Sequence, residues 1–379
     1  MGNQLRELAA AGQSVWLDNI RRSMFASGEL QKLVDVGVRG MTSNPTIFER
    51  AIGSGTDYDA QLKSLIGNER DPQNLFEALA IQDIRSACDV FAPVFKSTSG
   101  LDGFVSLEVS PTLAQDTKGT TGAAARLWKA VDRPNVTIKI PGTPECIASI
   151  RASIAAGINI NVTLLFSVDQ YAAAATAYID GLEDRVKAGQ PIDGIASVAS
   201  VFVSRIDTAI DKTLDERIAK GEKLEDLKGK AGVANLKLTY QKFEALFHSD
   251  RFGALKAKGG KVQRPLWAST STKNPRYHDL MYVVNVVGAD TVNTMPPATL
   301  DALLDHGAIE PDTIHKDVAG SKALVEALAA KGISLHDVTE QLVADGVKSF
   351  AQSFKEMLDA ISAKHEALAE RRPAKVEAQ

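Results

Sequence analysis

Lys139 is the residue whose type and position point most directly to chemistry. In the stretch 135–143, NVTIKIPGT, apolar residues alternate with a threonine and this lysine, which is the period of a β-strand. Pro141 and Gly142 end the strand before a helical pattern, so the lysine stands where a β/α barrel places catalytic groups. Burial there can lower the pKa of a lysine by as much as about 3–5 units and make it a nucleophile toward carbonyls. The alternative is a lysine that reaches solvent or pairs with a carboxylate.

Polar side chains also end four other β-like runs. Glu108 shares one face of GFVSLEV with Phe and Ser, whereas Asn161 and Thr163 share one face of INVTLLF. Asp18 comes near the end of SVWLDNI, and Asn44 ends VRGMTSN. Buried polar groups are costly unless they are hydrogen-bonded, so one interpretation is a ring of mutually satisfied side chains. A lysine, two carboxylates and a threonine at one barrel mouth favour instead general acid–base chemistry around a carbonyl.

A second group of residues has the composition of a phosphate site. Ser200 comes near the end of the run IASVASVF, and Arg205 follows where a helix is expected to begin. Ser271 and Lys273 cluster after the run RPLWAST, just before a proline. Cationic side chains, hydroxyls and helix N-termini together bind anions readily. The alternative is a solvated loop with helix caps, which serine-rich turns often form.

These residues need a scaffold that gathers strand ends, and the chain has eight β-like runs that alternate with helical stretches. A parallel α/β fold is indicated, and eight units predict a closed (β/α)₈ TIM barrel. The eight expected strands span 14–20, 38–44, 103–109, 136–141, 160–166, 195–202, 264–270 and 289–295.

Such a barrel needs about 250 residues, so a chain of 379 residues carries additions. One is a helical insertion of mixed charge at about 215–260. The other is a C-terminal helical extension at about 311–371, with helices expected over 318–331 and 335–368 and a frayed end after them. We see no internal repeat or low-complexity linker, which predicts one decorated domain over 1–379.

Composition narrows the classes of function. The chain is 44% hydrophobic and 24% charged with a net charge of −4, which argues against binding nucleic acid. No apolar run is long enough for a membrane span, and the N-terminus lacks a signal-peptide core. Cys88 and Cys146 are the only cysteines and the six histidines are dispersed, so neither a disulfide framework nor a metal site is expected. A cytoplasmic protein without metal is therefore predicted.

Five motifs then resemble one family. WLDNI, GMTSNPTIF, VSLEVSPTLAQDT, VTIKIPGTPE and INVTLLFS occur in this order on five successive predicted strands between Trp16 and Ser167. They resemble the transaldolases, and the insertion and long tail resemble the longer bacterial members. The resemblance implies a (β/α)₈ barrel and a Schiff-base mechanism without a cofactor. It also implies transfer of a dihydroxyacetone unit from sedoheptulose 7-phosphate to glyceraldehyde 3-phosphate in the pentose phosphate pathway.

The resemblance assigns catalytic roles to four residues. Lys139 matches the Schiff-base lysine of the IKIPGT motif, and Asp18 matches the acid/base carboxylate of the WLDN motif. Glu108 and Thr163 match the pair that holds a catalytic water near the imine.

The resemblance also assigns substrate-binding roles. Asn44 and Asn161 match side chains that hold the three-carbon fragment, and Ser200 and Arg205 match phosphate binders. Where many transaldolases have a second phosphate-binding arginine, this chain has Lys273, which neutralises phosphate but cannot form a bidentate fork.

Two other functions remain as alternatives. One is a stand-alone class I aldolase that uses the same lysine but releases the three-carbon fragment. The other is a non-catalytic barrel that binds sugar phosphates. In each case the expected partners are sugar phosphates, and the sequence leaves monomer and homodimer open.

Overall fold

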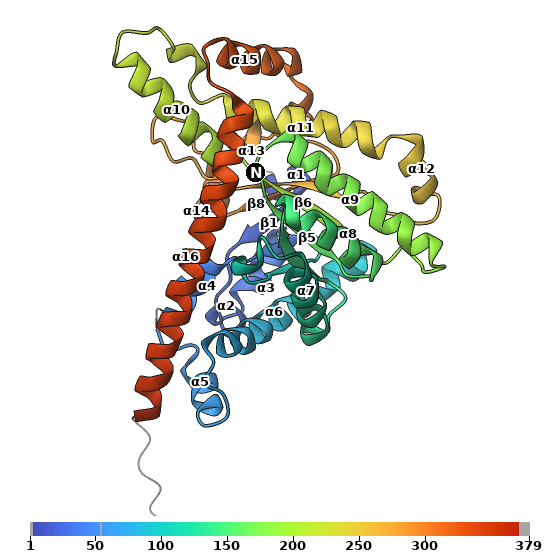
Figure 1. Cartoon of the computed structure of the whole chain (residues 1–379), viewed down its shortest axis with the longest axis vertical. Coiled ribbons are helices and arrows are strands. Elements are labelled where there is room, and N and C mark those ends of the chain that lie inside the picture. The colour runs from blue at the N-terminus through green and yellow to red at the C-terminus, as the bar shows by residue number, and fades with distance from the viewer. Residues whose placement is uncertain (1–2, 54, 371–379) are drawn as a thin grey trace, which may run out of the picture.

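Eight parallel strands close into a barrel in the order in which they occur along the chain. The computed structural model describes residues 3–53 and 55–370. All eight expected strands are present, and the prediction of a (β/α)₈ barrel is confirmed. The strands lie at the centre of Figure 1, with helices around them. The strands are β1 Gln13–Asp18, β2 Gly40–Thr42, β3 Val105–Glu108, β4 Val136–Pro141, β5 Ile160–Leu165, β6 Ser197–Phe202, β7 Arg264–Ala268 and β8 Thr291–Met295.

Helices follow the strands and form the outer layer. The longer ones are α3 Glu29–Val36, α4 Pro45–Gly53, α6 Pro72–Ser97, α7 Thr117–Val131, α8 Ile147–Ala155, α9 Val168–Lys187, α10 Ser204–Ile218, α11 Ala231–Phe247 and α14 Pro297–His306. Shorter ones are α1 Gln4–Ala10, α2 Ser23–Ala26, α5 Asp59–Leu65, α12 Asp250–Lys256 and α13 Met281–Val284, with 3₁₀ turns at Pro111–Leu113, Pro144–Cys146, Glu225–Leu227 and Thr313–His315.

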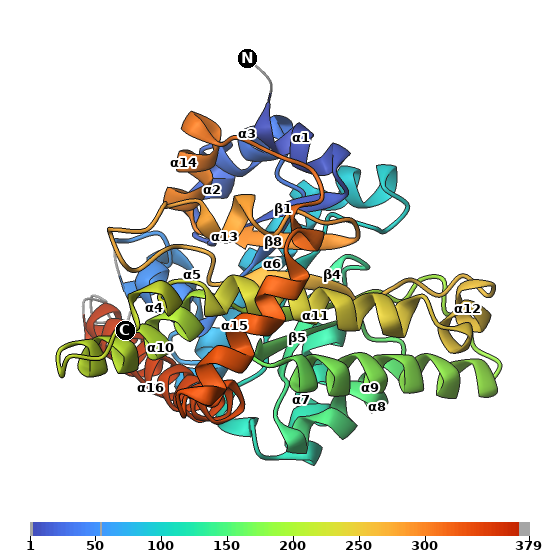
Figure 2. The same cartoon turned by 90° about the horizontal axis from the view of Figure 1, so that it is seen from above.

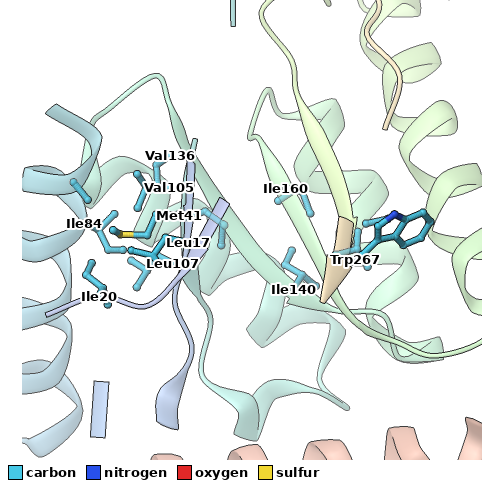
Figure 3. Packing of buried hydrophobic residues seen from close by; sticks show 14 of the residues in the cluster. Leu17, Ile20, Met41, Ile84, Val105, Leu107, Val136, Ile140, Ile160 and Trp267 are labelled. Carbon is cyan, nitrogen blue, oxygen red and sulfur yellow. The ribbon is translucent and has the colours of Figure 1, made fainter. Parts of the chain in front are cut away.

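The main hydrophobic core lies between the outer face of the barrel and these helices. Figure 3 shows Val105, Leu107 and Val136 of the strands gathered next to Ile84 of α6. Because side chains alternate along a strand, burying these residues outward turns their neighbours into the barrel. The apolar residues of β4 therefore face the helices, while Lys139 faces the interior.

Strand register brings the inward polar residues to one level. Glu108 is the register partner of Lys139 on β4, and Lys139 is the partner of Asn161 on β5. On the other side of the barrel, Asp18 of β1 is the partner of Thr42 on β2. All of these residues except Asn161, the second residue of β5, lie at or near the carboxyl ends of their strands, so the fold gathers them toward one mouth of the barrel.

The opposite, N-terminal end of the barrel holds a buried ion pair. Arg264 at the start of β7 lies 3.0 Å (Nη1 to Oδ1) from Asp102, and the two residues are only 4% and 5% exposed. Ser14 and Trp16 of β1 donate further hydrogen bonds to the Asp102 carboxylate, at 2.6 and 3.2 Å. This network cross-links strands and the loop before β3 at the base of the barrel.

The insertion supplies part of the helical layer. Helix α11 packs against α9, and Figures 1 and 2 both show the two helices side by side. It also contacts β7, so its outer-layer position is that of a barrel helix. Helix α15 Val318–Ala330, the first helix of the tail, packs onto α11.

The last helix, α16 Leu335–Glu370, crosses the mouth side of the barrel. It packs along α4 and contacts α6, α10 and the end of β5, as its position beside α4 in Figure 1 illustrates. Both tail helices occur where the sequence predicted them. The expected frayed end, 371–379, lies outside the described residues. Within residues 3–53 and 55–370, no helix has the length and apolar character needed to cross a membrane.

Candidate active site

A cavity of about 440 Å³ opens at the carboxyl ends of the strands. Its wall includes eight of the ten residues singled out from the sequence: Asp18, Asn44, Lys139, Thr163, Ser200, Arg205, Ser271 and Lys273. The other two, Glu108 and Asn161, contact residues of that wall. The structure therefore brings all ten candidates to one site.

Lys139 is buried at the inner end of this cavity, with 4% of its surface exposed. Its Nζ donates a hydrogen bond of 2.9 Å to the backbone carbonyl of Ser43 and lies 3.0 Å from Oε2 of Glu108. The lysine thus does pair with a carboxylate, as one interpretation of the sequence had it. It also opens to a substrate-sized cavity, which a purely structural pair would not need.

Glu108 and Thr163 flank the lysine, and each has an oxygen atom without a hydrogen-bond partner within the described chain. Burial raises the pKa of Glu108, the Lys139 charge and hydrogen bond oppose this, and the Asp18 charge raises it further. Oε1 of Glu108 and Oγ1 of Thr163 are buried and make no hydrogen bond within the described chain. Buried polar atoms are normally satisfied, so these two atoms mark a place for a polar partner.

Asp18 belongs to a chain of hydroxyl groups that the sequence analysis did not single out. Thr42 donates from Oγ1 to Oδ1 of Asp18 at 2.7 Å, and its oxygen lies 2.7 Å from Oγ1 of Thr294 on β8. Burial raises the pKa of Asp18, whereas the Thr42 hydrogen bond and the Lys139 charge lower it. Thr42 could have been predicted from the sequence. It stands two residues before Asn44, so the alternation of side chains along the strand turns both residues to the same side.

The amides at the site are held by hydrogen bonds. Asn161 donates to Ser106 at 3.0 Å and accepts from Ser200 at 2.7 Å. Ser200, expected at the phosphate, is therefore bonded to the amide that is expected at the three-carbon fragment. Asn44 accepts from the backbone N–H of Ile47 at 3.0 Å and so also caps the start of α4.

The outer end of the cavity is cationic. Lys273 donates to Ser271 at 2.8 Å, and burial together with the charges of Arg205 and Arg50 lowers the pKa of Lys273. Arg50 of α4 also lines the cavity but was missed by the sequence analysis. The sequence feature that could have predicted it is a basic residue one to two turns into a helix that starts at the barrel mouth.

Aromatic rings from two distant segments complete this outer end. Phe202 ends β6 and Phe350 lies on α16, and both line the cavity beside Arg205. No local pattern points to Phe350, because nothing in the residues around it indicates which face of a tail helix meets the barrel mouth. Separately, within residues 3–53 and 55–370 no group of three or more His, Cys, Asp or Glu is arranged to hold a metal ion.

Comparison with known proteins gives a consistent result. A family model described as transaldolase/fructose-6-phosphate aldolase matches residues 15–361. A protein of Trichodesmium erythraeum described as transaldolase is 46% identical over 371 residues, which is 96% of this chain and 97% of that protein. Transaldolases of Mycolicibacterium smegmatis and Mycobacterium tuberculosis are 48% and 47% identical, over 94% and 93% of this chain and 96% and 95% of theirs.

Proposed function

The chain belongs to the transaldolase/fructose-6-phosphate aldolase family, and we propose that it is a transaldolase that works through a Schiff base on Lys139. In this proposal it transfers a dihydroxyacetone unit from sedoheptulose 7-phosphate to glyceraldehyde 3-phosphate, as a step of the pentose phosphate pathway. The products are erythrose 4-phosphate and fructose 6-phosphate. One observation carries the proposal: a buried lysine ends a cavity whose far end is lined by cations.

The first step is imine formation. The amine of Lys139 must be neutral to attack the C2 ketone of the donor, and the carboxylate of Glu108, 3.0 Å away, is placed to take its proton. Loss of water from the carbinolamine then gives an iminium ion. The unsatisfied Oε1 of Glu108 and Oγ1 of Thr163 support a role in holding the water that leaves and later returns.

The second step breaks the C3–C4 bond. Asp18 takes the proton of the C4 hydroxyl, the C4 oxygen becomes a carbonyl, and the bonding electrons enter the iminium to form an enamine. Erythrose 4-phosphate leaves, the enamine attacks the aldehyde carbon of the acceptor, and Asp18 returns its proton to the new hydroxyl. The raised direction of the Asp18 pKa supports this double role, because a group that takes and returns a proton works better as its pKa approaches the operating pH.

The remaining residues hold the two ends of the sugar. We propose that Asn44 and Asn161 bind the hydroxyls of the three-carbon fragment. Arg205, Ser271 and Lys273 are proposed to bind the phosphate, Arg205 as a planar fork and Lys273 as a point charge.

A second candidate is an aldolase that releases the fragment, since the matching family model carries both descriptions. The two differ in what an acceptor does. Transfer predicts that glyceraldehyde 3-phosphate accelerates turnover of the donor, whereas a stand-alone aldolase releases dihydroxyacetone at the same rate without it. A cytoplasmic location is part of the proposal and rests on two buried cysteines that form no disulfide.

Borohydride trapping tests the Schiff base directly. Reduction in the presence of fructose 6-phosphate should inactivate the protein and leave the reduced three-carbon fragment on Lys139, as peptide mass spectrometry would locate. Lys139→Met should give no adduct. An adduct on Lys237 or Lys273 would refute the assignment of the nucleophile. The lack of any adduct would also refute it, and would indicate a binding protein rather than an enzyme of this class.

A further inference from the structure

We propose that Phe350, on the helix that the chain adds after its barrel, is a positioning residue for Arg205 and makes the enzyme selective for phosphorylated sugars. The inference rests on the proposed function, because it concerns the outer end of the same cavity.

The side chain of Arg205 has an unusual environment for a half-buried guanidinium. Within the described residues its contacts are with two aromatic rings, and no carboxylate lies in ion-pair range. Its Cζ is 5.4 Å from the ring centre of Phe202 and 5.8 Å from that of Phe350. A cation over a ring face is stabilised electrostatically, yet all five of its N–H donors remain for a ligand.

This arrangement suits a phosphate better than a carboxylate-paired arginine would. An arginine held by a protein carboxylate must give up that partner when a phosphate binds, whereas rings hold the planar group without competing for its donors. Burial also lowers the pKa of Arg205, in keeping with a guanidinium that is partly shielded from water. A dianionic ligand is then bound by a cation that is already oriented and partly desolvated.

Helix α16 fixes the second ring at its place. One turn before Phe350, a methyl group on Gly346 would lie 3.0 Å from Cδ2 of Leu164 and 3.7 Å from Nη1 of Arg205, so the helix packs directly over both. One turn after it, Ser353 accepts a hydrogen bond of 3.0 Å from Thr46 of α4. The ring therefore stands on a segment that is held to the barrel on both sides.

The anchoring continues along the helix. Near its start, Glu340 accepts from Gln170 of α9 at 2.9 Å. Near its end, Lys364 pairs with Asp59 of α5 at 3.0 Å and donates to the backbone carbonyl of Gly55. These contacts place Phe350 as a rigid wall rather than a mobile side chain at the mouth.

Steady-state kinetics with two acceptors tests the proposal. With sedoheptulose 7-phosphate saturating, Phe350→Ala should raise KM for glyceraldehyde 3-phosphate and Ki for inorganic phosphate by about 3- to 30-fold. KM for D-glyceraldehyde, the same acceptor without phosphate, should change less than about twofold, because the contacts of Lys139 are with Ser43 and Glu108 and do not involve the ring. Phe350→Tyr should preserve the selectivity, whereas Phe350→Leu, which fills the space without a π face, should lose it.

Phe354 offers a matched control on the same helix. It is also 5% exposed, but its ring packs edge-on against Phe76 at 5.7 Å, away from Arg205. Phe354→Ala removes the same atoms from α16, and it should change KM for both acceptors by similar factors. If Phe350→Ala behaves in the same way, Phe350 is only a packing residue and the proposal is wrong.

The double variant decides whether Phe350 acts through Arg205. In an Arg205→Ala background, Phe350→Ala should add no further loss of selectivity. Additive losses would overturn the proposal. Failure of the proposed function is a separate result: it would appear as no borohydride adduct on Lys139 in the wild type, while the Kd of inorganic phosphate, measured by titration calorimetry, would still report on Phe350.

Discussion

The two ends of the barrel each bury an ion pair, and the two pairs differ in what surrounds them. At the base, Arg264 and Asp102 lie 3.0 Å apart, and at the mouth, Lys139 and Glu108 are also 3.0 Å apart. All four residues are at most 7% exposed. Burial of charge alone therefore does not separate a structural pair from a functional one.

The hydrogen bonding of the carboxylate and the space around the pair do separate them, although Nε of Arg264 makes no hydrogen bond within the described chain. Both oxygens of Asp102 accept hydrogen bonds, and the void beside Arg264 is about 20 Å³, too small for a substrate. At the mouth, Oε1 of Glu108 makes no hydrogen bond within the described chain, and Lys139 opens to about 440 Å³. The mouth lies at the carboxyl ends of the strands, which is the end of the barrel where the active sites of barrel enzymes are found.

Replacing one cation of each pair by methionine should give the largest contrast. Lys139→Met should lower transfer by about 10⁴-fold or more, because the nucleophile is gone. Arg264→Met should instead lower the free energy of unfolding by about 3–5 kcal/mol, because Asp102 is left buried without its partner. The measurements are initial rates and chemical denaturation on both variants.

The free energy of unfolding of Lys139→Met, compared with that of Arg264→Met, tests the distinction between the two pairs most directly. Glu108 already has a raised pKa, so it can take up a proton when the lysine is removed, and the loss of stability should be smaller than for Arg264→Met. An Arg264→Met protein with wild-type stability, or a Lys139→Met protein that keeps a hundredth of the activity, would remove the distinction between the two ends.

How far the sequence could anticipate these regions depends on the range of the interactions. The strands and Lys139, Glu108 and Thr163 follow from alternation within six or seven residues, and the structure confirms where they lie. Arg264 and Asp102 are far apart in the chain and were not singled out, because each looks like an ordinary charged residue at a strand edge.

The same limit explains what was missed at the mouth. Thr294 enters the site only because β8 closes the barrel against β1, and Phe350 only because α16 folds back over α4. Barrel closure and the docking of a tail helix leave no local pattern. The family resemblance supplied the roles of Asn44 and Asp18, which spacing alone left open.

Asp18→Ala tests a smaller effect within the mouth. Imine formation should survive, but C3–C4 cleavage should slow by about 10²- to 10⁴-fold, because no positioned base takes the C4 proton. Intact-protein mass spectrometry after borohydride should then show the whole donor, joined with loss of water and reduced, rather than the three-carbon fragment. A variant that melts earlier yet carries only the three-carbon fragment would reduce Asp18 to a structural residue like Asp102.

The smallest effect compares two hydroxyls that make similar bonds at the two ends. Thr42 donates to Asp18 at 2.7 Å, and Ser14 donates to Asp102 at 2.6 Å. Thr42→Val removes a contact that lowers the pKa of Asp18, so that pKa should rise further above its unfolded value. Since cleavage needs the carboxylate, the acid limb of kcat/KM should move to higher pH. Thr42→Ser, which keeps the hydroxyl, should restore the limb.

At the base the same deletion should have no such signature. Ser14→Ala should lower the free energy of unfolding by about 1–3 kcal/mol, because Asp102 loses a donor, and leave the pH profile of kcat/KM unchanged. For Thr42→Val the pH dependence of the free energy of unfolding also has a fixed direction. A carboxyl group with a raised pKa destabilises the fold when it is ionised. Any loss of free energy of unfolding should therefore be present at neutral pH and should fade as the pH falls through the pKa of the folded state. An acid limb that moves equally in both variants would show that the profile reports general loosening of the barrel and not the protonation of Asp18.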